Sequence, residues 1–550
     1  MKSAVRLLLF IVCLTSAAAQ AGTQSVIGQA KALAEQGQAK TALHLLDSIQ
    51  ANDLPVGYFV LRGTLEAQLG LYSKAETDLV TAMGRQPNLP SVLYTIGLVR
   101  LELGKYEEAR DALQRSVTAS PDNPRSWLAL GEAYANLKNP AELDRCLQKA
   151  LELGGNSATI QYGAATIYQK AGRPAQAAEC FQQAAALDPT NKTAMALCVR
   201  SLLISGQIEK ARAAARTWRD AHPNFVPQNV EIGTVFGEMQ FYPDAIEQFQ
   251  QVLRISPSLT EAKYNLALAY LFNGNYDAAA ALAQDLKTHQ DKSAENLLGL
   301  IKEEQGDIVA ARAAFQASLA VAPHSAATLY HLGRIALELT DFAAAQRDFQ
   351  ASAGFCAGNC IEPLLGIATA YKLQGKFDEA ASTIESVIRR EPNDVIGYLY
   401  LGDTFIRAHN YIKASEVLRK AVTVNAGSGL AHYMYAYALL KQSPNVVPEA
   451  AISSLRTAIR LDPKSGLPYL RLGTIYLQHG DYAKAKPLLQ TAAALEPSMK
   501  DAHFQFATVL KKLGESQLAE KEFEKFRLLT NERMQEDVSM MGELRRISPN

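Results

Sequence analysis

Apolar residues recur along this chain with one period. In most periods a small residue stands four positions before a large apolar one, a spacing that places both on the same face of an α-helix. The pair returns every 34 residues through the first half of the chain and every 32 to 37 residues afterwards. The pattern predicts one helix per period through most of the sequence. The first members of the pairs, all small except Leu143, are Ala75, Ala109, Leu143, Ala177, Ala211, Ala245, Ala279, Ala311, Ala345, Ala380, Ala414, Ala451, Ala485 and Ala519.

Turn signals divide each period into two helices. A Gly-x-aromatic-x-x-Ala segment begins at five glycines, and glycine ends a helix well because it accepts a left-handed backbone. Prolines follow the second helix, and proline cannot continue a helix. We therefore predict a helix, a tight turn and a second helix in each period. The glycines are Gly70, Gly104, Gly274, Gly375 and Gly480, and the prolines are Pro87, Pro121, Pro189, Pro223, Pro257, Pro323, Pro392, Pro463 and Pro497.

The fullest unit contains Trp127-x-x-Leu130-Gly131-x-x-Tyr134. This pattern resembles the tetratricopeptide repeat (TPR), with its W-x-x-L-G-x-x-Y…A-x-x-x-F…P signature over 34 residues. The resemblance covers roughly residues 56–530 as about fourteen units. It implies an all-α fold, a right-handed superhelical solenoid of helix-turn-helix repeats in which the first helices line the concave face.

The phase of the repeat divides the chain into five segments. We expect a signal peptide at residues 1–19 and an N-terminal capping half-repeat at 20–55, where Gly37 and Ala42 stand in phase. The TPR array follows in two halves, 56–291 and 292–527, with longer turns at 354–360 and 444–448. Residues 528–550 are expected to form a C-terminal capping helix and tail, because the open end of a solenoid needs cover.

The first residues are typical of a secretory signal. Lys2 and Arg6 precede an apolar run at 7–14, and Ala17 and Ala19 fit a cleavage site before Gln20. We expect export to the periplasm or the extracellular space, with an uncleaved anchor or a misread start as the alternatives. No later stretch is long and apolar enough for a membrane helix, so no integral membrane segment is expected after signal removal.

Charge and motifs argue against most chemistry. Lys plus Arg equal Asp plus Glu at 55 each, so no global field attracts nucleic acid. The sequence has no H-E-x-x-H, G-x-S-x-G, G-x-G-x-x-G or G-x-x-x-x-G-K-[ST] motif. His324 and His331 are close in sequence, but no cysteine or carboxylate set completes a metal site. We therefore expect that the protein is not an enzyme and that it binds no cofactor and no metal.

The six cysteines fall into two groups after Cys13 in the signal. Cys356 and Cys360 bracket a longer turn, where a disulfide is a prediction if the protein is exported and free thiols are the alternative. Cys146, Cys180 and Cys198 occupy helices of successive repeats. They are interpreted as small buried apolar residues, with a bridge between Cys180 and Cys198 as the alternative.

Candidate binding residues follow from the resemblance, which places the second, fifth, ninth, twelfth and thirteenth positions of each unit on the groove. Aromatic and Arg side chains at such positions suit peptide recognition, since these types dominate binding hot spots. The alternative is that they solvate the groove or pack across it. Asn265 is compatible with one place in the carboxylate clamp of some family members. The other candidates are Tyr330, Arg334, Asp403, Arg407, Tyr433, Tyr437 and Arg471, the last at an adjoining position.

These observations predict a non-catalytic scaffold that binds other proteins or peptides on the concave face. A structural subunit of a cell-envelope assembly or polysaccharide-export machine is the first alternative, and an enzyme with a site built in the groove is the second. The sequence leaves the partner and the oligomeric state open.

Overall fold

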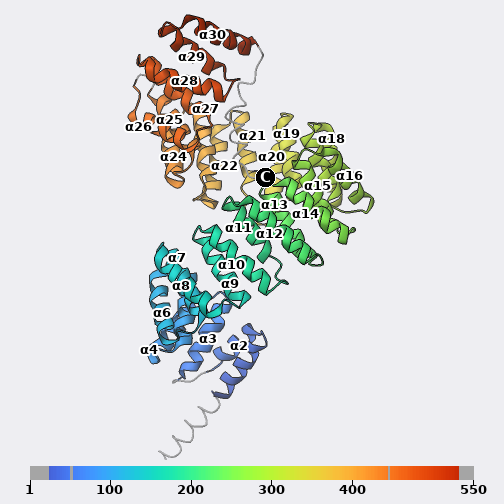
Figure 1. The fold of residues 1–550 in the computed structure, drawn as a ribbon, viewed down its shortest axis with the longest axis vertical. Helices are drawn as coiled ribbons and strands as arrows, with labels where there is room; N and C mark the ends of the chain where they lie inside the picture. Colours follow the sequence, from blue (N-terminus) through green and yellow to red (C-terminus); the bar gives the residue numbers. More distant parts are fainter. Residues whose placement is uncertain (1–23, 50–53, 359, 444–445, 532–550) are drawn as a thin grey trace, which may run out of the picture. The chain divides into compact units, whose positions relative to one another are not determined.

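The computed structural model describes residues 24–49, 54–358, 360–443 and 446–531. Within those ranges every regular element is an α-helix (Figure 1). This confirms the predicted fold class. The expected signal peptide and the tail after residue 531 lie outside the described residues. The chain forms two compact units, unit 1 through Leu282 and unit 2 from Ala283.

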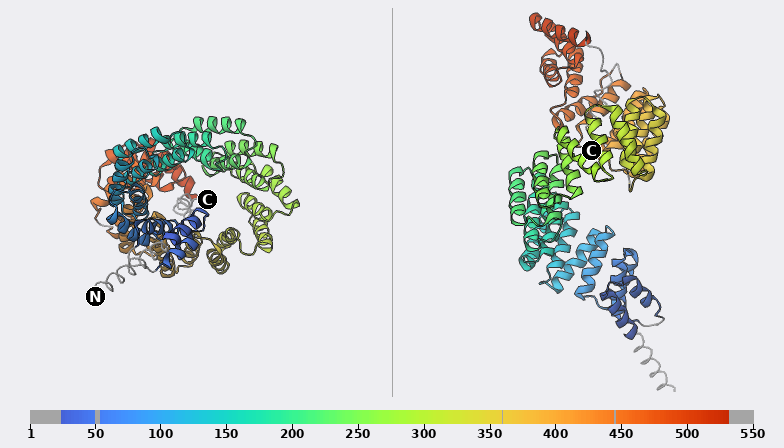
Figure 2. Two further views of the ribbon diagram at one scale, coloured as in Figure 1. Left: turned by 90° about the horizontal axis from the view of Figure 1, so that it is seen from below. Right: turned by 90° about the vertical axis from the view of Figure 1, so that its right-hand side faces the viewer.

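Unit 1 is built from helix pairs that stack in chain order (Figures 1 and 2). The first helices of its pairs are α3 (Val56–Gln68), α5 (Pro90–Glu102), α7 (Pro124–Asn136), α9 (Ala158–Lys170), α11 (Ala194–Ile204), α13 (Val226–Glu238) and α15 (Thr260–Phe272). The second helices are α4 (Tyr72–Arg85), α6 (Tyr106–Ala119), α8 (Pro140–Gly154), α10 (Pro174–Leu187), α12 (Ile208–Ala221), α14 (Tyr242–Ile255) and α16 (Tyr276–Thr288), which contains the division point.

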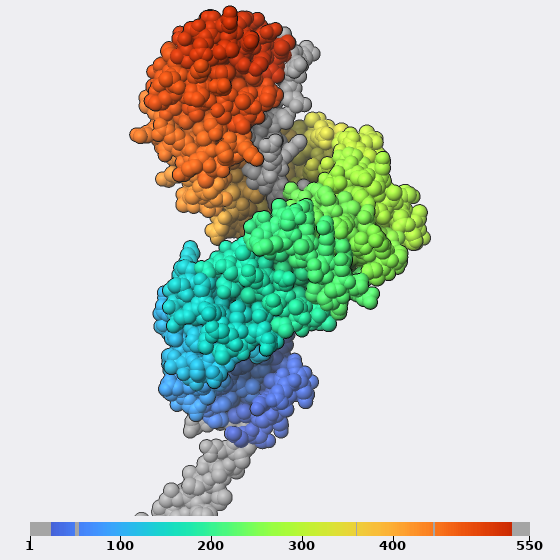
Figure 3. All heavy atoms as spheres, viewed as in Figure 1, coloured from blue at the N-terminus to red at the C-terminus, as the bar shows by residue number. Residues whose placement is uncertain are grey.

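Unit 2 repeats the arrangement, and side chains close the spaces between its ribbons (Figure 3). Its first helices are α17 (Ala294–Glu304), α19 (Ala326–Glu338), α21 (Glu362–Leu373), α23 (Val395–Arg407), α25 (Gly429–Gln442), α27 (Gly466–Gln478) and α29 (Lys500–Lys512). Its second helices are α18 (Ile308–Val321), α20 (Phe342–Phe355), α22 (Phe377–Arg390), α24 (Tyr411–Val424), α26 (Glu449–Leu461), α28 (Tyr482–Leu495) and α30 (Ser516–Asn531).

The N-terminal segment holds more structure than the expected half-repeat. Residues 24–35 are helical and are followed by α2 (Ala39–Asp47), so this segment contains a helix pair. Ala30, Ala42 and Leu46 are fully buried and pack with Tyr58 of α3. The pair therefore covers the apolar face of the first full repeat, as a cap is expected to do.

Small residues in the first helices allow close packing on the second helices. A Cβ placed on Gly402 would lie 2.4 Å from Leu418 Cδ2, and one on Gly233 would lie 2.7 Å from Phe249 Cε1. Both pairs have the same separation along the chain. Val199 and Ala215 share that separation but reverse the sizes, and both are buried. One large and one small side chain thus share each of these contacts, which keeps the packing dense without overlap.

The turns between paired helices use a left-handed residue, as predicted. Gly104 has φ +72°, its N–H donates to the Leu101 carbonyl, and the next N–H donates to the Arg100 carbonyl. These two bonds close a Schellman motif. Thr340 takes the same place in its repeat at φ +59° with the equivalent bonds. A β-branched residue is strained there, so the turn geometry is imposed by the repeat rather than by glycine.

An aromatic or histidine side chain near the start of several first helices binds the preceding turn. Trp127 Nε1 donates to the Pro121 carbonyl at 2.8 Å, and Tyr398 Oη donates to the Pro392 carbonyl at 3.1 Å. Each donor lies six residues after its acceptor. This bond satisfies a carbonyl near the end of the preceding second helix, which would otherwise need water. The same bond is made by Tyr469 to Pro463, His503 to Pro497 and His432 to Ala426.

Candidate functional site

The sequence-predicted binding residues occupy four first helices of unit 2 and one of unit 1. Asn265 lies half-buried on α15 of unit 1, and the structure places no other candidate of the set in that unit. The unit 2 candidates are Tyr330 and Arg334 on α19, Asp403 and Arg407 on α23, Tyr433 and Tyr437 on α25, and Arg471 on α27. They form two groups with different surroundings.

The residues on α19 are engaged with their own neighbours. Arg334 is about half exposed, and its Nη2 lies 3.6 Å from Oε1 of Glu303 on α17. The other oxygen of Glu303 lies 2.8 Å from Nδ1 of His331. Tyr330 packs on Phe349 with ring centroids 5.6 Å apart, and burial raises the pKa of Tyr330. Glu303 therefore already supplies Arg334 with a counter-charge.

Asp403 is fully buried (0 % exposed) rather than open to a groove. Its Oδ2 lies 2.6 Å from Nζ of Lys372 on α21, a side chain that is 3 % exposed. Burial lowers the pKa of Lys372, and the Asp403 carboxylate opposes that effect. Arg407 is the second cation on Asp403, with Nε 3.3 Å from both carboxylate oxygens. Asp403 thus holds two cations in place and is not itself available to a partner.

Lys372 was missed by the sequence reasoning, although a signal for it exists. Lys372 precedes Asp403 by 31 residues. Glu303 precedes Arg334 by the same separation. The two pairs join equivalent positions of successive first helices with the charges exchanged. A search for opposite charges at that separation would have placed Asp403 in an ion pair.

Tyr437 lies at the centre of a second group. Its ring centroid is 5.1 Å from Cζ of Arg471, 5.7 Å from Nζ of Lys441 and 6.4 Å from the ring of the buried Tyr433. Cations attract the face of an aromatic ring at these distances. Lys441 was not predicted, yet it stands one repeat length after Arg407. Arg407 lies on α23, a helix in contact with α25, and we call Arg407, Tyr437, Lys441 and Arg471 the Tyr437 patch.

Among the residues that the structure describes, the patch cations have no carboxylate partner other than Asp403. Within the described part of the chain, Lys441 and Arg471 make no ion pair, and Arg407 pairs with Asp403 alone. Arg471 Nε is buried and has no hydrogen-bond partner there. Arg407 is 30 % exposed and Lys441 is exposed. The patch therefore presents positive charge beside an aromatic ring.

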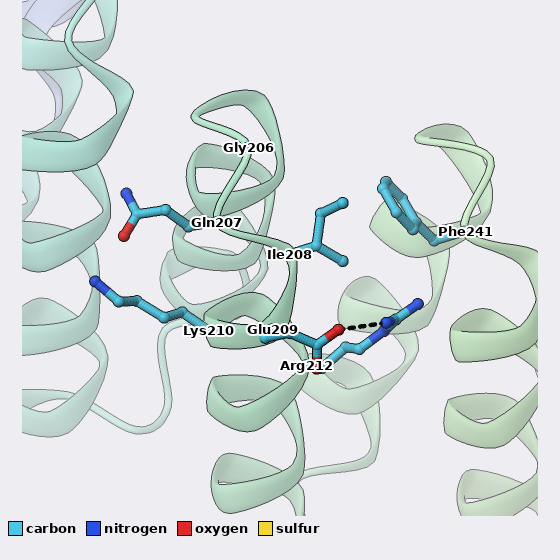
Figure 4. Close-up of a pocket in the computed structure, with 7 residues that line it drawn as sticks. All are labelled: Gly206, Gln207, Ile208, Glu209, Lys210, Arg212 and Phe241. Atoms are coloured by element: carbon cyan, nitrogen blue, oxygen red, sulfur yellow. Dashed lines mark hydrogen bonds and ion pairs between the residues drawn. The ribbon is translucent and has the colours of Figure 1, made fainter.

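A shallow hollow of about 470 Å³ in unit 1 has no comparable character (Figure 4). It lies at the turn before α12, between Ile208 and Phe241. Arg212 at its edge is satisfied by Glu209 at 2.7 Å and by both oxygens of Asp244 at 2.8 and 2.9 Å. Lys210 extends away from Phe241 (Figure 4). The Arg212 guanidinium at the edge of the hollow is thus already neutralised by carboxylates of unit 1.

The described cysteines fall into two groups. Cys356 and Cys360 form a disulfide across the longer turn after α20, with Cα atoms 6.2 Å apart. Cys146, Cys180 and Cys198 are free and buried. Burial raises the pKa of the Cys146 and Cys198 thiols to about 12 and that of Cys180 to about 11. These three thiols are packing groups, because only the thiolate is a good nucleophile.

Metal-ligating side chains are scattered over the residues that the structure covers. There, no three His, Cys, Asp or Glu side chains gather in a way that could hold a metal ion. Among the same residues, no helix has both the length and the apolarity needed to cross a bilayer.

Comparison with known proteins identifies the repeat. Models described as "Tetratricopeptide repeat" match residues 94–142, 168–228, 230–294, 296–359, 365–423 and 448–498, more than half of the chain. Anaphase-promoting complex subunit 3 of Schizosaccharomyces pombe is 26 % identical over 144 residues, which are 26 % of this chain and 21 % of that protein. The chain thus matches only about a fifth of the length of this curated relative.

Solved structures show weak overall likeness. The anaphase-promoting complex assembly Cut9–Hcn1 is 14 % identical with TM-score 0.36, over 83 % of this chain and 97 % of that chain. Yeast Tom70 is 15 % identical with TM-score 0.40, over 83 % and 99 %. MamA is 26 % identical with TM-score 0.27, over 30 % and 95 %. Scores of this size support no argument about shared function.

Proposed function

The chain belongs to the tetratricopeptide-repeat family of protein-interaction scaffolds, and from this premise we propose that it is an exported scaffold. It binds a protein or peptide on the first-helix face of unit 2, the face that the family resemblance predicts to be concave. Proteins built from this repeat generally act without catalysis, and the proposal assigns no reaction to this one.

The observation that supports this site is the Tyr437 patch. Aromatic and Arg side chains that are partly exposed and held by neighbours are the types that contribute most to protein interfaces. Tyr437 is half-buried against Tyr433, and Arg407 is fixed by Asp403. Little side-chain freedom is lost when such residues bind, so less free energy is spent on ordering them.

The proposed location outside the cytoplasm is supported by the N-terminal residues. Lys2, Arg6, the apolar run 7–14 and the small residues 17–19 have the order of a secretory signal. Cell fractionation of the full chain tests this proposal. We expect the protein in the periplasm or the medium with a shortened N-terminus, and a full-length protein in the cytoplasm would refute export.

Site-specific photocrosslinking in cells tests the binding face. A photoreactive phenylalanine derivative replaces Tyr437 on α25 in one variant and the exposed Arg419 on the second helix α24 in a control. We expect a discrete protein adduct from Tyr437 and none from Arg419. Equal adducts from both positions, or an adduct from Arg419 alone, would contradict the proposed face.

A further inference from the structure

The Tyr437 patch carries more positive charge than its own side chains neutralise. Lys441 Nζ and Arg471 Cζ lie 5.7 and 5.1 Å from the centroid of the same ring, so the two cations are at most about 11 Å apart. Within the described residues neither has a carboxylate partner. Like charges at this range repel one another, and an anion between them would remove that cost.

Equivalent positions in unit 1 show how this chain normally pairs such a cation. Lys170 Nζ lies 2.6 Å from Oε1 of Glu132 on the preceding first helix, and the two residues are 38 positions apart. Arg200 and Glu238 form an ion pair at the same separation with the charges exchanged. Each ion pair bridges two neighbouring first helices. At these two places unit 1 neutralises its own charges.

The same rule assigns Asp403 to Lys441, because Asp403 precedes Lys441 by the separation that joins Glu132 to Lys170. Asp403 is instead buried between Lys372 and Arg407, and its single charge is shared by those two cations. Lys441 is turned to the Tyr437 ring. Five charged groups are therefore involved, of which four are positive and one is negative. They are Lys372, Arg407, Lys441, Arg471 and the single carboxylate Asp403.

We propose that the Tyr437 patch binds an acidic segment of the partner protein through at least two carboxylates. This inference rests on the proposed function and names the chemistry of the partner at that site. One carboxylate lies between Lys441 and Arg471 beside the Tyr437 ring. The second carboxylate accepts hydrogen bonds from the guanidinium N–H groups of Arg407 that do not donate to Asp403. A planar guanidinium binds carboxylates well because it can donate two parallel hydrogen bonds.

The helix spacing sets the expected spacing of the two carboxylates. Arg407 lies on α23 and Tyr437 on α25, which is in contact with α23. Packed helices are about 8–10 Å apart, and a peptide in the polyproline II conformation advances about 3.1 Å per residue with three residues per turn, so every third side chain points the same way. Two acidic residues about three positions apart would therefore reach both sites.

Fluorescence anisotropy with the full mature chain tests the inference. The probes are fluorescein-labelled extended peptides with Glu at every second, third or fourth residue, and matched peptides with Gln in place of Glu. We expect binding of Glu peptides that weakens with added salt, best at the third-residue spacing, and no binding of the Gln peptides.

Two charge-matched variants locate the binding. Lys441→Gln with Arg471→Gln removes two patch charges, and Arg419→Gln with Lys420→Gln removes two exposed charges from α24. We expect the first variant to weaken binding of the Glu peptide by about tenfold or more and the second by less than about twofold. Circular dichroism confirms that both variants keep their helix content.

The outcomes separate this inference from the proposed function. A Tyr437 adduct in cells together with equal binding of the Glu and Gln peptides would leave the binding face in place and overturn the acidic partner. Equal affinity of both double variants would overturn it as well. Binding of polyglucuronate but of none of the peptides would replace the protein segment with an acidic polysaccharide, and loss of the Tyr437 adduct would remove the face itself.

Discussion

Two glycines of α13 provide a sharp test of how paired helices pack. A Cβ on Gly233 would lie 2.7, 2.9 and 3.0 Å from three ring carbons of Phe249, whereas a Cβ on Gly237 would meet nothing within 4 Å. Alanine gains about 1 kcal/mol over glycine in a helix interior. Overpacking a tight contact costs about 1–3 kcal/mol. Phe249 is only 2 % exposed, so its ring cannot turn out into solvent.

We therefore expect opposite results from the same substitution one helical turn apart. Gly237→Ala, in the last turn of α13, should stabilise its repeat by up to about 1 kcal/mol, and Gly233→Ala should destabilise it by up to about 2 kcal/mol. Hydrogen exchange of backbone amides in α13 and α14 measures this locally, which suits a repeat protein that need not unfold in one step. Each difference of about 1.4 kcal/mol changes the opening equilibrium about tenfold.

Two controls accompany this measurement. Peptides from α27 and α28 of unit 2 should exchange as in the unchanged protein, because repeats interact with their nearest neighbours. Phe249→Ala should lower the free energy of unfolding by about 3–5 kcal/mol when made alone. The loss should be smaller in the Gly233→Ala protein, because the added methyl group fills part of the space that the ring leaves, as Val199 does opposite Ala215. Equal protection of the Gly233→Ala and Gly237→Ala proteins would refute the close-contact reasoning.

Three further substitutions test the turn, a buried carboxyl and the buried ion pair. Thr340→Gly should raise stability by about 1 kcal/mol in denaturant titration, because it relieves a left-handed β-branched residue, and an unchanged midpoint would contradict strain there. Burial and the nearby Asp78 raise the pKa of Glu66 to about 6 from 4.5. The folded state therefore binds the proton of the Glu66 carboxyl more tightly than the unfolded state does. The stability that this proton contributes is fully present below about pH 4.5 and is lost above about pH 6. The free energy of unfolding of the Glu66→Gln protein should exceed that of the unchanged protein by about 2 kcal/mol at about pH 7.5 and by progressively less as the pH falls toward 4.5. A difference that does not depend on pH would show that the ionisation of Glu66 is not its cause. Lys372→Met should cost about 3–5 kcal/mol, whereas Lys372→Met with Asp403→Leu should be close to neutral, and equal losses in both would show that the pair itself stabilises the unit.

The fold followed closely from the sequence because each repeat signal has a local cause. Gly104 ends a helix in the expected left-handed turn, and Ala109 is buried in the second helix as its phase predicted. The helix pair at the N-terminus was underestimated because its turn signals were weaker than those of later repeats. Only Gly37 and Ala42 carried the phase there, and no proline separates that pair from the next repeat in the expected place.

The candidate site was harder to predict because charge pairing joins residues about one repeat apart. Asp403 has a groove position by phase, yet Lys372 of the preceding first helix draws it inward. Lys441 was overlooked because its lack of a carboxylate partner among the described residues follows only once Asp403 is known to pair with Lys372 and Arg407. Tyr437 and Arg471 do lie together, since aromatic and Arg side chains at neighbouring first-helix positions face one another.

The bond from Trp127 to the Pro121 carbonyl crosses the border between two repeats, and Tyr398 and Tyr469 cross theirs in the same way. A designer who transplants a repeat and cuts at the first residue of its first helix would separate the donor from its acceptor. A repeat unit for transfer should therefore begin at the proline, so that the acceptor carbonyl and the donor side chain stay in the same segment.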